Sequence, residues 1–470
     1  MRDFENEALV HDPLHGYITF TSDDGLPPGE VSEQQLIDHP WLERLRQIHQ
    51  LQTAWWVFPS GEHTRFQHVL GVMHLASRAA AALYESLART CPETPSRAYV
   101  ESLLRLAGLL HDVGHGPFGH FLDVHLLSDY GLTHETLGGQ IIREELGELI
   151  RAVRRNPSGR LADDEQLDPS QITYLITRPR DEAPGDSVDD APRWLHLLRS
   201  LFSGIYTIYN MDFVLRDAYM TGFSHRAFDL DRLLHYSFFS EQGLTMHARG
   251  VPALVRFVGI RGELFRSVYF HRTVRGIDLS LADLFAESKS LLFPSNPGGD
   301  LGAYRRFTEW SMLVDVGAWS DSPDPAKQAL GERWRAFLDR KVRWKMVCER
   351  SVFFRPDDAE RSSVLNSAEL FETALRDLLP ANVARVPLRF DVARHIHRPG
   401  TRGPVAGQNF VFDPARDAIR PLTDNDLFRQ LPSSFRICRI YAEDAAHAAT
   451  LARALDELVG AGGGDELTNM

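Results

Sequence analysis

One stretch decides the fold and its chemistry: LLRLAGLLHDVGHGPFGH, which spans residues Leu103–His120. Its apolar residues have the spacing of a buried helix, an adjacent His111-Asp112 pair follows at once, and His115 and His120 come shortly after. Neutral imidazoles beside a carboxylate suit a divalent transition metal better than Ca, which prefers oxygen ligands. The competing interpretation, capping and loop histidines, does not readily explain three imidazoles within ten residues. The stretch therefore predicts a metal site at the end of a core helix.

Further histidines flank this stretch on both sides. Upstream, HTRFQHVLGV (residues 63–72) places His68 at the start of an alanine-rich helical run. Downstream, His134 lies between Thr133 and Glu135. The order along the chain is thus a histidine on one helix, a His-Asp pair on the next, and a further histidine beyond them.

This order resembles the HD-domain metallophosphohydrolases. Within them it is most similar to the deoxynucleoside triphosphate triphosphohydrolases, which include the sterile-alpha-motif/HD proteins and the bacterial deoxyguanosine triphosphohydrolase relatives. The resemblance covers residues 8–280 and has a weaker echo at the C-terminus. Besides the segments above, it is carried by HDPLHGYI (11–18), ERLRQIHQL (43–51), VFPSG (57–61), LRD (215–217) and VYFHR (268–272).

The resemblance implies a set of metal ligands and catalytic groups. The metal ligands of the family match His68, His111 and Asp112, and the metal is expected to be Mn, Fe, Ni, Zn or Mg. Groups that surround the scissile phosphate match His115, His120, Asp123 and His134. Among them, His134 is expected to protonate the leaving 5′-oxygen, and Asp123 to orient it. Loop histidines and a helix cap explain any one of these four residues, but explain the set poorly.

The resemblance also implies substrate-binding residues. Gln50 and Asp217 match residues that bind the sugar 3′-hydroxyl, and ordinary polar residues on a helix surface are an equally good interpretation of both. Arg65 and Arg261 match phosphate-binding arginines, whose planar donors suit phosphate. Tyr269 matches a tyrosine that packs against the 2′ face of the sugar and so favours deoxyribose.

One segment departs from the family pattern. The family's fourth metal ligand opens a motif Asp-Arg/Lys-x-Asp-Tyr, which reads YNMDF here (residues 209–213). Tyr209 replaces the metal Asp, Asn210 the phosphate-binding cation, and Phe213 the phosphate-contacting tyrosine. Three outcomes stay open: Asp212 reaches the metal from a neighbouring helical face, Tyr209 ligates as phenolate, or the site binds a nucleotide without catalysis.

The resemblance extends to a regulatory nucleotide site, with changes. Asp38 and Arg46 match residues that read an activator base, whereas Glu43 stands where the family has Gln. A basic residue that grips nucleotide phosphate between subunits is replaced by Ala8. A homo-oligomer formed through this N-terminal region is the expectation from the family.

Composition agrees with this interpretation without selecting it. The 470 residues, 43% of them hydrophobic, can bury a large core. The net charge of −13 argues against broad nucleic-acid binding but not against a small anionic substrate. Three scattered cysteines, no signal peptide and no apolar stretch of membrane-spanning length predict a cytoplasmic protein.

Helical periodicity dominates the chain, so the expected fold class is mainly α: an HD-domain helical core with a small C-terminal α+β region. We expect the core over residues 1–350 with its metal motifs within 46–220, the α+β region over 351–459, and a disordered tail over 460–470. Strands are expected at 16–20, 386–390 and 435–441. Helices are expected at 66–91, 98–112, 134–155, 194–222, 252–275, 302–316, 325–350 and 442–459.

The expected function is metal-dependent hydrolysis of a nucleoside triphosphate, preferably deoxy, to nucleoside and inorganic triphosphate. Two alternatives stay open. The chain could be an HD phosphohydrolase for another phosphorylated substrate, or a non-catalytic nucleotide-binding sensor or scaffold, because Tyr209 replaces the fourth metal Asp. A nucleotide and further copies of the chain are the expected partners.

Overall fold

The computed structural model describes residues 6–177, 191–354, 365, 367–396, 409–431 and 434–459. Contacts within the chain divide it into two compact units. The first unit comprises the described parts of 1–260, 293–313 and 401–429, and the second those of 261–292, 314–400 and 430–470. The expected boundary near residue 350 stays a prediction, because this division assigns 261–292 and 314–350 to the same unit as the C-terminal strands.

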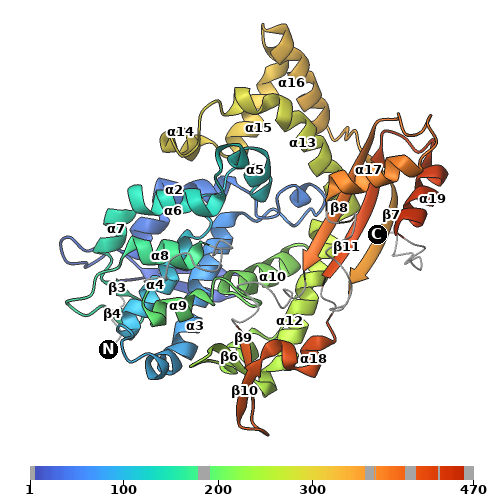
Figure 1. Ribbon diagram of the computed structural model, residues 1–470. Helices are drawn as coiled ribbons and strands as arrows, with labels where there is room; N and C mark the ends of the chain where they lie inside the picture. The colour runs from blue at the N-terminus through green and yellow to red at the C-terminus, as the bar shows by residue number, and fades with distance from the viewer. Residues whose placement is uncertain are drawn as a thin grey trace. The chain divides into compact units, whose positions relative to one another are not determined.

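Helices make up most of the first unit (Figure 1). Its α-helices are α1 (Glu33–Ile37), α2 (Pro40–Glu43), α3 (Arg65–Thr90), α4 (Arg97–Leu110), α5 (His120–His125), α6 (His134–Glu144), α7 (Gly147–Ala152), α8 (Pro169–Ile176), α9 (Arg193–Arg199), α10 (Ile208–Met220), α11 (Leu230–His235), α14 (Leu301–Arg306) and α18 (Asp426–Arg429). Short 3-10 turns are η1 (Arg44–Gln47), η2 (Ala54–Trp56), η3 (Leu127–Tyr130), η4 (Ala248–Gly250) and η9 (Leu422–Asp424). Helices α12 (Val251–Leu264) and α15 (Glu309–Ala318) each cross from one unit into the other.

The site depends on the packing of α3 against α4. Helix α3 begins at a capping box in which the Thr64 backbone N–H donates to the Gln67 side chain, 2.6 Å away. Helix α4 begins at Ser96, whose hydroxyl accepts from the backbone N–H of Tyr99. A Cβ at Gly108 would lie 3.0 Å from the backbone oxygen of Val72, so glycine lets the two helices approach closely. This crossing brings the first turn of α3 next to the last turn of α4.

Short sheets complete the first unit. Strands β1 (Glu7–Asp12) and β2 (Gly16–Thr21) form an antiparallel hairpin in which His11 pairs with Tyr17. A second sheet has the strand order β10-β9-β6-β5, in which only the β6–β9 pair is parallel. Its strands are β5 (Ser237–Ser240), β6 (Gly243–His247), β9 (Asn409–Asp413) and β10 (Ala418–Pro421), and β3 (Arg155–Asn156) pairs with β4 (Gly159–Arg160).

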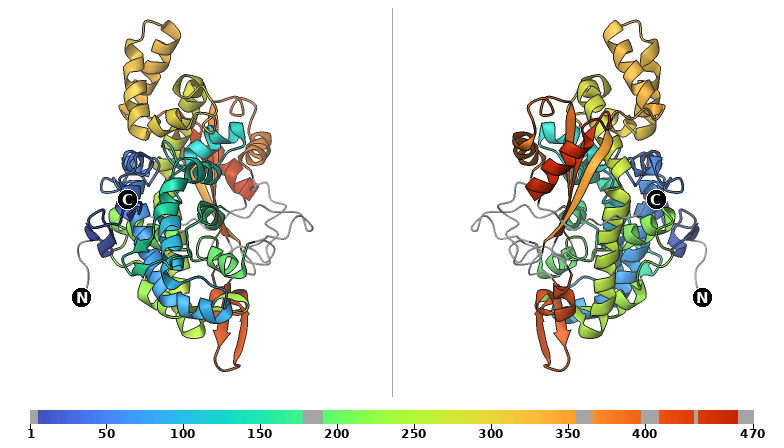
Figure 2. Two further views of the ribbon diagram at one scale, coloured as in Figure 1. Left: turned by 90° about the vertical axis from the view of Figure 1, so that its left-hand side faces the viewer. Right: turned by 90° about the vertical axis from the view of Figure 1, so that its right-hand side faces the viewer.

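The second unit contains a three-stranded antiparallel sheet with the order β7-β11-β8. Its strands are β7 (Lys345–Phe354), β8 (Leu388–Ile396) and β11 (Ser434–Ala442), and its helical segments are η5 (Phe265–Tyr269, a π-helical turn), α13 (Arg272–Leu292), η6 (Trp319–Asp321), α16 (Pro325–Leu338), α17 (Ala368–Leu378) and α19 (Ala448–Val459). Helices α17 and α19 lie beside the sheet (Figure 2), and their apolar side chains share a core with Cys438 and Ile440 of β11. On the other side, Phe435 and Ile437 pack against Phe265 and Phe270. Every residue of β11 is buried, which is typical of a central strand covered on both faces.

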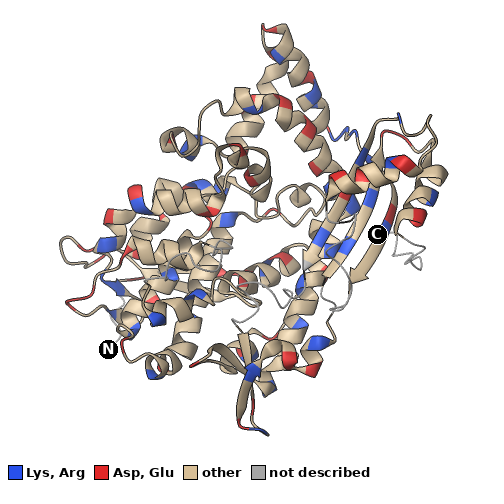
Figure 3. Cartoon of the chain, in the orientation of Figure 1, with Lys and Arg blue, Asp and Glu red and all other residues tan. Residues whose placement is uncertain are grey.

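Arginines along these strands (blue in Figure 3) are partly neutralised inside the unit. Asp391 of β8 accepts from Arg275 at 2.6 Å and from Arg439 at 3.4 Å. The predicted strands at 16–20 and 435–441 are confirmed as β2 and β11, whereas the strand predicted at 386–390 begins later, at Leu388, and extends to Ile396 as β8. The fold is mainly α with α+β elements toward the C-terminus.

Several predicted helices are shorter than expected. The helix predicted for 325–350 is wrong beyond Leu338, because 345–354 form β7, which pairs with β11 over nearly its whole length. The helices predicted for 134–155, 194–222, 252–275 and 302–316 are each interrupted. The predicted disordered tail lies outside the described residues. Among the described residues, we find no helix long and apolar enough to cross a membrane.

Candidate metal centre

Three predicted ligands meet where α3 crosses α4. His68 lies on the first turn of α3, and His111 and Asp112 directly follow the last residue of α4. Each offers a ligand atom, and these atoms lie within 4.8 Å of one another. His68 and Asp112 are buried and His111 is nearly so. The structure thus brings His68 to the His111-Asp112 pair, from which more than forty positions of sequence separate it.

Both histidines of this triad are oriented by a hydrogen bond at Nδ1. In His111, Nδ1 donates to the backbone oxygen of Gly108 at 2.8 Å. In His68, Nδ1 contacts the Asp212 carboxylate at 2.8 Å. A carbonyl or ionised carboxylate only accepts, so Nδ1 carries the proton and Nε2 keeps its lone pair for a metal.

The Asp112 carboxylate is held between a cation and the histidines. Its Oδ2 accepts from the Arg65 guanidinium at 2.7 Å, and its Oδ1 lies 3.2 Å from Nε2 of His111 and 3.5 Å from Nε2 of His115. Two imidazole lone pairs and one carboxylate oxygen therefore face the same small volume. This donor set fits a divalent transition metal with open positions for other ligands.

A second cluster lies beside the triad and contains all four predicted catalytic residues: His115, His120, Asp123 and His134. Asp123 accepts from Nδ1 of His134 at 2.6 Å and from Nδ1 of His120 at 3.1 Å. The backbone N–H of His134 also donates to Asp123 at 2.9 Å. The rings of His115 and His134 stack with centroids 3.8 Å apart, and His115 connects the two clusters through its contact with Asp112.

Burial and nearby charges set the protonation of both clusters. Burial lowers the pKa of His111 to about 4 despite the opposing charge of Asp112. Burial and the Arg65 guanidinium hold the pKa of His115 well below its ordinary value. Burial disfavours ionisation of both carboxyls, but His111 and the Arg65 guanidinium outweigh it and lower the pKa of Asp112. Hydrogen bonds from His120 and His134 likewise lower the pKa of Asp123. At neutral pH His111 and His115 are neutral and the carboxylates are charged, which suits metal binding.

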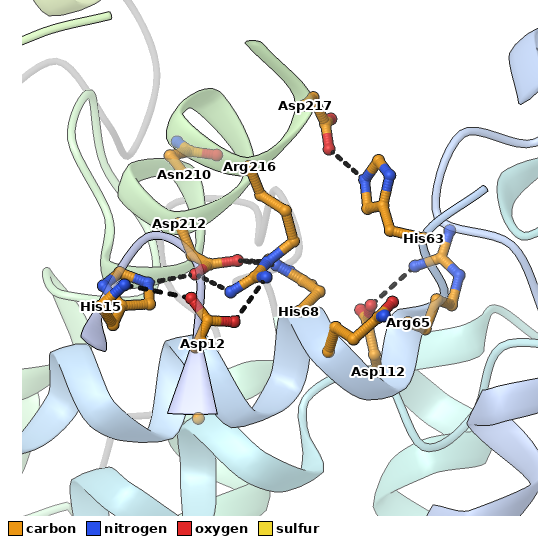
Figure 4. Close-up of polar contacts among 12 residues, drawn as sticks. Asp12, His15, His63, Arg65, His68, Asp112, Asn210, Asp212, Arg216 and Asp217 are labelled. Atoms are coloured by element: carbon orange, nitrogen blue, oxygen red, sulfur yellow. Dashed lines mark hydrogen bonds and ion pairs between the residues drawn. The ribbon is translucent and has the colours of Figure 1, made fainter. Parts of the chain in front are cut away.

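The segment that differs from the family motif, residues 209–213, lies at the start of α10. The ring of Tyr209 stacks on the ligand His111, with centroids 5.6 Å apart and planes tilted by 21°. Asp212 is fully buried, and its two oxygens contact His15, His68 and Arg216 (Figure 4). Asp212 therefore contacts Nδ1 of the candidate ligand His68, and its role as a fourth ligand stays a prediction. A phenolate role for Tyr209 stays a prediction.

Some of the predicted substrate residues lie close together in the chain's fold. The backbone N–H of Gln50 donates to the backbone oxygen of His63, and His63 contacts the Asp217 carboxylate at 2.8 Å (Figure 4). At and around this site, four of the buried side-chain atoms that have no hydrogen-bond partner among the described residues are Oε1 of Gln50, Nδ1 of His63, Nε of Arg65 and Nδ1 of His115. Unsatisfied buried polar atoms at one site are what a ligand-binding site shows without its ligand.

The remaining predicted residues are not brought into this cluster. Arg261 and Tyr269 belong to the second unit, Tyr269 at the end of the π-helical turn, so their roles toward the substrate stay predictions. Asp38 and Arg46 are exposed. Arg46 pairs with Glu43 at 2.8 Å and lies over the ring of Phe66. The regulatory nucleotide site also stays a prediction.

The sequence analysis did not identify the residues that support the two clusters without belonging to them. Arg44 donates to the backbone oxygen of His115 at 2.6 Å and so supports the loop between the two clusters. His15 of the hairpin and Arg216 both contact Asp212, and Asp12 accepts from Arg216. These residues do lie within the segments that carry the family resemblance. The sequence, however, does not reveal which residues they contact.

The HD domain family model matches residues 65–177, which contain both clusters. Among curated proteins, the chain is similar to uncharacterized protein YwfO of Bacillus subtilis, with 26% identity over 84% of this chain and 82% of that protein. It is also similar to the deoxynucleoside triphosphate triphosphohydrolase SAMHD1 of Homo sapiens, with 27% identity over 93% of this chain and 70% of that protein. The SAMHD1 of Bos taurus is 27% identical over 60% of this chain, and the chain spans about half of that relative's length (47%).

A solved structure has the same fold. The crystal structure of a hypothetical protein from Aquifex aeolicus matches 96% of this chain and 100% of its own with a TM-score of 0.66. Their sequence identity is 23%, so this likeness concerns the fold alone.

Proposed function

The chain contains an HD domain and resembles the deoxynucleoside triphosphate triphosphohydrolases, and from this premise we propose that it hydrolyses a deoxynucleoside triphosphate to a nucleoside and inorganic triphosphate. The observation that carries the proposal is the contact between the two clusters. Nε2 of His115 lies 3.5 Å from Oδ1 of Asp112, so the candidate metal ligands adjoin the histidines that would surround a scissile phosphate.

His68, His111 and Asp112 would hold a divalent metal, which supplies positive charge to a phosphate oxygen and lowers the pKa of water. Arg65 also suits a phosphate, because its guanidinium uses Nη1 on Asp112 and has a buried Nε with no partner among the described residues. The guanidinium can thus contact a phosphate oxygen while it holds Asp112.

His134 is the proposed proton donor. Asp123 accepts from Nδ1 of His134 at 2.6 Å, which leaves Nε2 to deliver a proton to the departing 5′-oxygen. The Asp123 carboxylate only accepts, so this hydrogen bond fixes which ring nitrogen of His134 faces the substrate. His115 stacks on His134 and fixes the plane of its ring. Cleavage is therefore expected between the 5′-oxygen and the α-phosphorus.

The sugar would be held by Gln50 and Asp217. The amide oxygen of Gln50 is buried without a partner among the described residues, and Asp217 is buried beside His63. A 3′-hydroxyl can donate its one proton to the Asp217 carboxylate and accept from the side-chain NH2 of Gln50, so it suits such a pair. Tyr269 is the proposed wall against a 2′-hydroxyl.

A second function follows from Tyr209, which replaces a carboxylate with a ring stacked on His111. A centre with one negative charge fewer binds its metal cation more weakly. A chain that binds a nucleotide without hydrolysing it would act as a sensor. The same assay distinguishes the two functions, since a sensor retains nucleotide and releases no product.

The proposal is tested by incubating the purified chain with each common deoxy- and ribonucleoside triphosphate under Mn, Fe, Ni, Zn or Mg. Products are separated by anion-exchange chromatography. We expect a nucleoside and inorganic triphosphate, with faster release from deoxynucleotides, and about 100-fold slower release from His134→Gln, which lacks the proton donor. Pyrophosphate with a nucleoside monophosphate, or no product from a chain loaded with metal, would contradict the proposal.

A further inference from the structure

The β1–β2 hairpin reaches the candidate metal centre through one carboxylate, that of Asp212. His15, in the turn between β1 and β2, has a side chain only 2% exposed. Its Nε2 contacts Oδ1 of Asp212 at 2.7 Å, and Oδ2 of the same carboxylate contacts Nδ1 of His68 at 2.8 Å (Figure 4). One carboxylate therefore joins a hairpin residue to a metal ligand, across 197 positions of sequence between His15 and Asp212.

Arg216 fixes the position of that carboxylate. Its Nε and Nη2 donate to the two oxygens of Asp212 at 2.9 and 3.0 Å, in a bidentate arrangement that sets the carboxylate plane. Its Nη1 donates to Oδ2 of Asp12 at 2.8 Å. The other oxygen of Asp12 accepts from the backbone N–H groups of Leu14 and His15, so the same residue shapes the hairpin turn.

Gly71 lets this network lie against α3. A Cβ at this position would be 2.0 Å from Oδ1 of Asp212 and 2.5 Å from Nη2 of Arg216. Gly71 follows His68 by less than one turn of α3, so the carboxylate is pressed against the helix that carries the ligand. The network has little space in which to move, and all of its charged groups are buried.

From these contacts we propose that His15 is a positioning residue of the metal centre: through Asp212 it holds the His68 ring in the orientation that directs Nε2 toward the metal. The inference rests on the proposed metal site and requires no particular substrate. The competing explanation is that His15 merely fastens the hairpin. That role would affect the stability of the chain and not the affinity of the triad for metal.

The test measures the dissociation constant of Mn²⁺ or Zn²⁺ by competition with a chromophoric chelator, together with the thermal midpoint of the metal-free chain. His15→Ala leaves Oδ1 of Asp212 without this donor and is expected to weaken metal binding about tenfold, as loss of an outer partner of a ligating histidine does. His15→Gln keeps an amide N–H near the place of Nε2 and is expected to restore most of the affinity.

His11→Ala is the matched control, because His11 is a histidine of the same hairpin that is exposed and stacks on Tyr17. It should leave the metal dissociation constant unchanged. Wild-type metal affinity in His15→Ala, whatever its thermal midpoint, would overturn the proposal, as would equal weakening in His11→Ala. The measurement uses metal alone, so a chain that binds metal but hydrolyses no nucleotide would contradict the proposed function and not this inference.

Discussion

At the scale of single residues, Arg44 shows how a charged side chain serves the site without touching it. Its guanidinium is buried and donates to five backbone oxygens at 2.6–3.3 Å: those of Val113, His115, Tyr304, Arg305 and Phe307. These carbonyls belong to the loop between the two clusters and to the segment around α14. A planar fork with five N–H donors suits this arrangement, whereas an ammonium has only three donors.

Replacing Arg44 by Lys should therefore lower the free energy of unfolding by about 2 kcal/mol, because carbonyls lose their donors and a buried cation loses partners. The measurement is the urea midpoint of the metal-free chain. Arg46→Lys is the control, since Arg46 is exposed and its pair with Glu43 contributes about 0–1 kcal/mol. Equal midpoints for the two variants would show that the guanidinium geometry is unimportant.

Tyr209 offers a direct change of charge at the centre. Tyr209→Asp places a carboxylate beside His111, and a negative charge near a divalent cation should strengthen metal binding by tenfold or more, depending on the local dielectric. The same chelator competition measures it. Unchanged affinity would mean that this turn of α10 does not face the metal. Tyr209→Phe is the control: it should bind metal as the wild type does, and loss of metal would identify the phenolate as a ligand.

His74 gives a pH dependence whose sign is fixed by burial. Burial, helped by His15, Arg78 and Arg105, lowers the pKa of His74 to about 4 from an ordinary value of 6.5. Between these values the unfolded chain binds more protons than the folded chain. The contribution of His74 to stability is therefore lost as the pH falls from about 6.5 to 4.

His74→Gln should consequently unfold with a shallower pH dependence in this window. For a half-buried ring the difference from the wild type at the acidic end is about 2 kcal/mol, reduced from about 3 by solvent screening. Chelated, metal-free protein is used, so that metal binding does not contribute. His225→Gln, at an exposed position, should follow the wild-type curve. Parallel curves for all three proteins would refute the assignment.

At the scale of elements, α3 and α4 follow from the sequence, because apolar periodicity is a local signal. Strand β7 was not predicted, since KMVCERSVFF continues from a helical segment and its alternation is blurred by charges. The site divides in the same way. Ligand chemistry pointed to His111 and Asp112, and the family resemblance added His68 and the second cluster. The contact of His15 with Asp212 is tertiary and leaves no pattern in either segment.

Gly71→Ala tests the packing of the network against α3. Alanine normally stabilises a helix interior by about 0.5–1 kcal/mol over glycine. At position 71 we expect the opposite sign, with weaker metal binding as well, because the added Cβ would displace Asp212. Gly259→Ala of α12 is the control, since nothing lies within 4 Å of the added Cβ, and it should raise the thermal midpoint. A stabilised Gly71→Ala with wild-type metal affinity would refute the close packing.

At the scale of the whole molecule, the first unit alone supplies the triad, the second cluster and the hairpin network. The second unit holds Arg261 and Tyr269, which the resemblance assigns to phosphate and sugar. The candidate metal centre is therefore complete within the first unit, and the roles of Arg261 and Tyr269 toward the substrate stay predictions. A metal that binds only the folded chain should also stabilise it, by about 2.7 kcal/mol at a free concentration 100 times the dissociation constant.

The central claim is that His68, His111 and Asp112 hold one metal ion, and elemental analysis of purified chains tests it most directly. The wild type is expected to carry close to one Mn, Fe, Ni or Zn per chain, and the double variant His111→Ala/Asp112→Ala to carry none. A second double variant, His120→Ala/Asp123→Ala, disrupts the neighbouring cluster and should keep its metal. Full metal occupancy in His111→Ala/Asp112→Ala, or loss of the metal only from His120→Ala/Asp123→Ala, would contradict the claim.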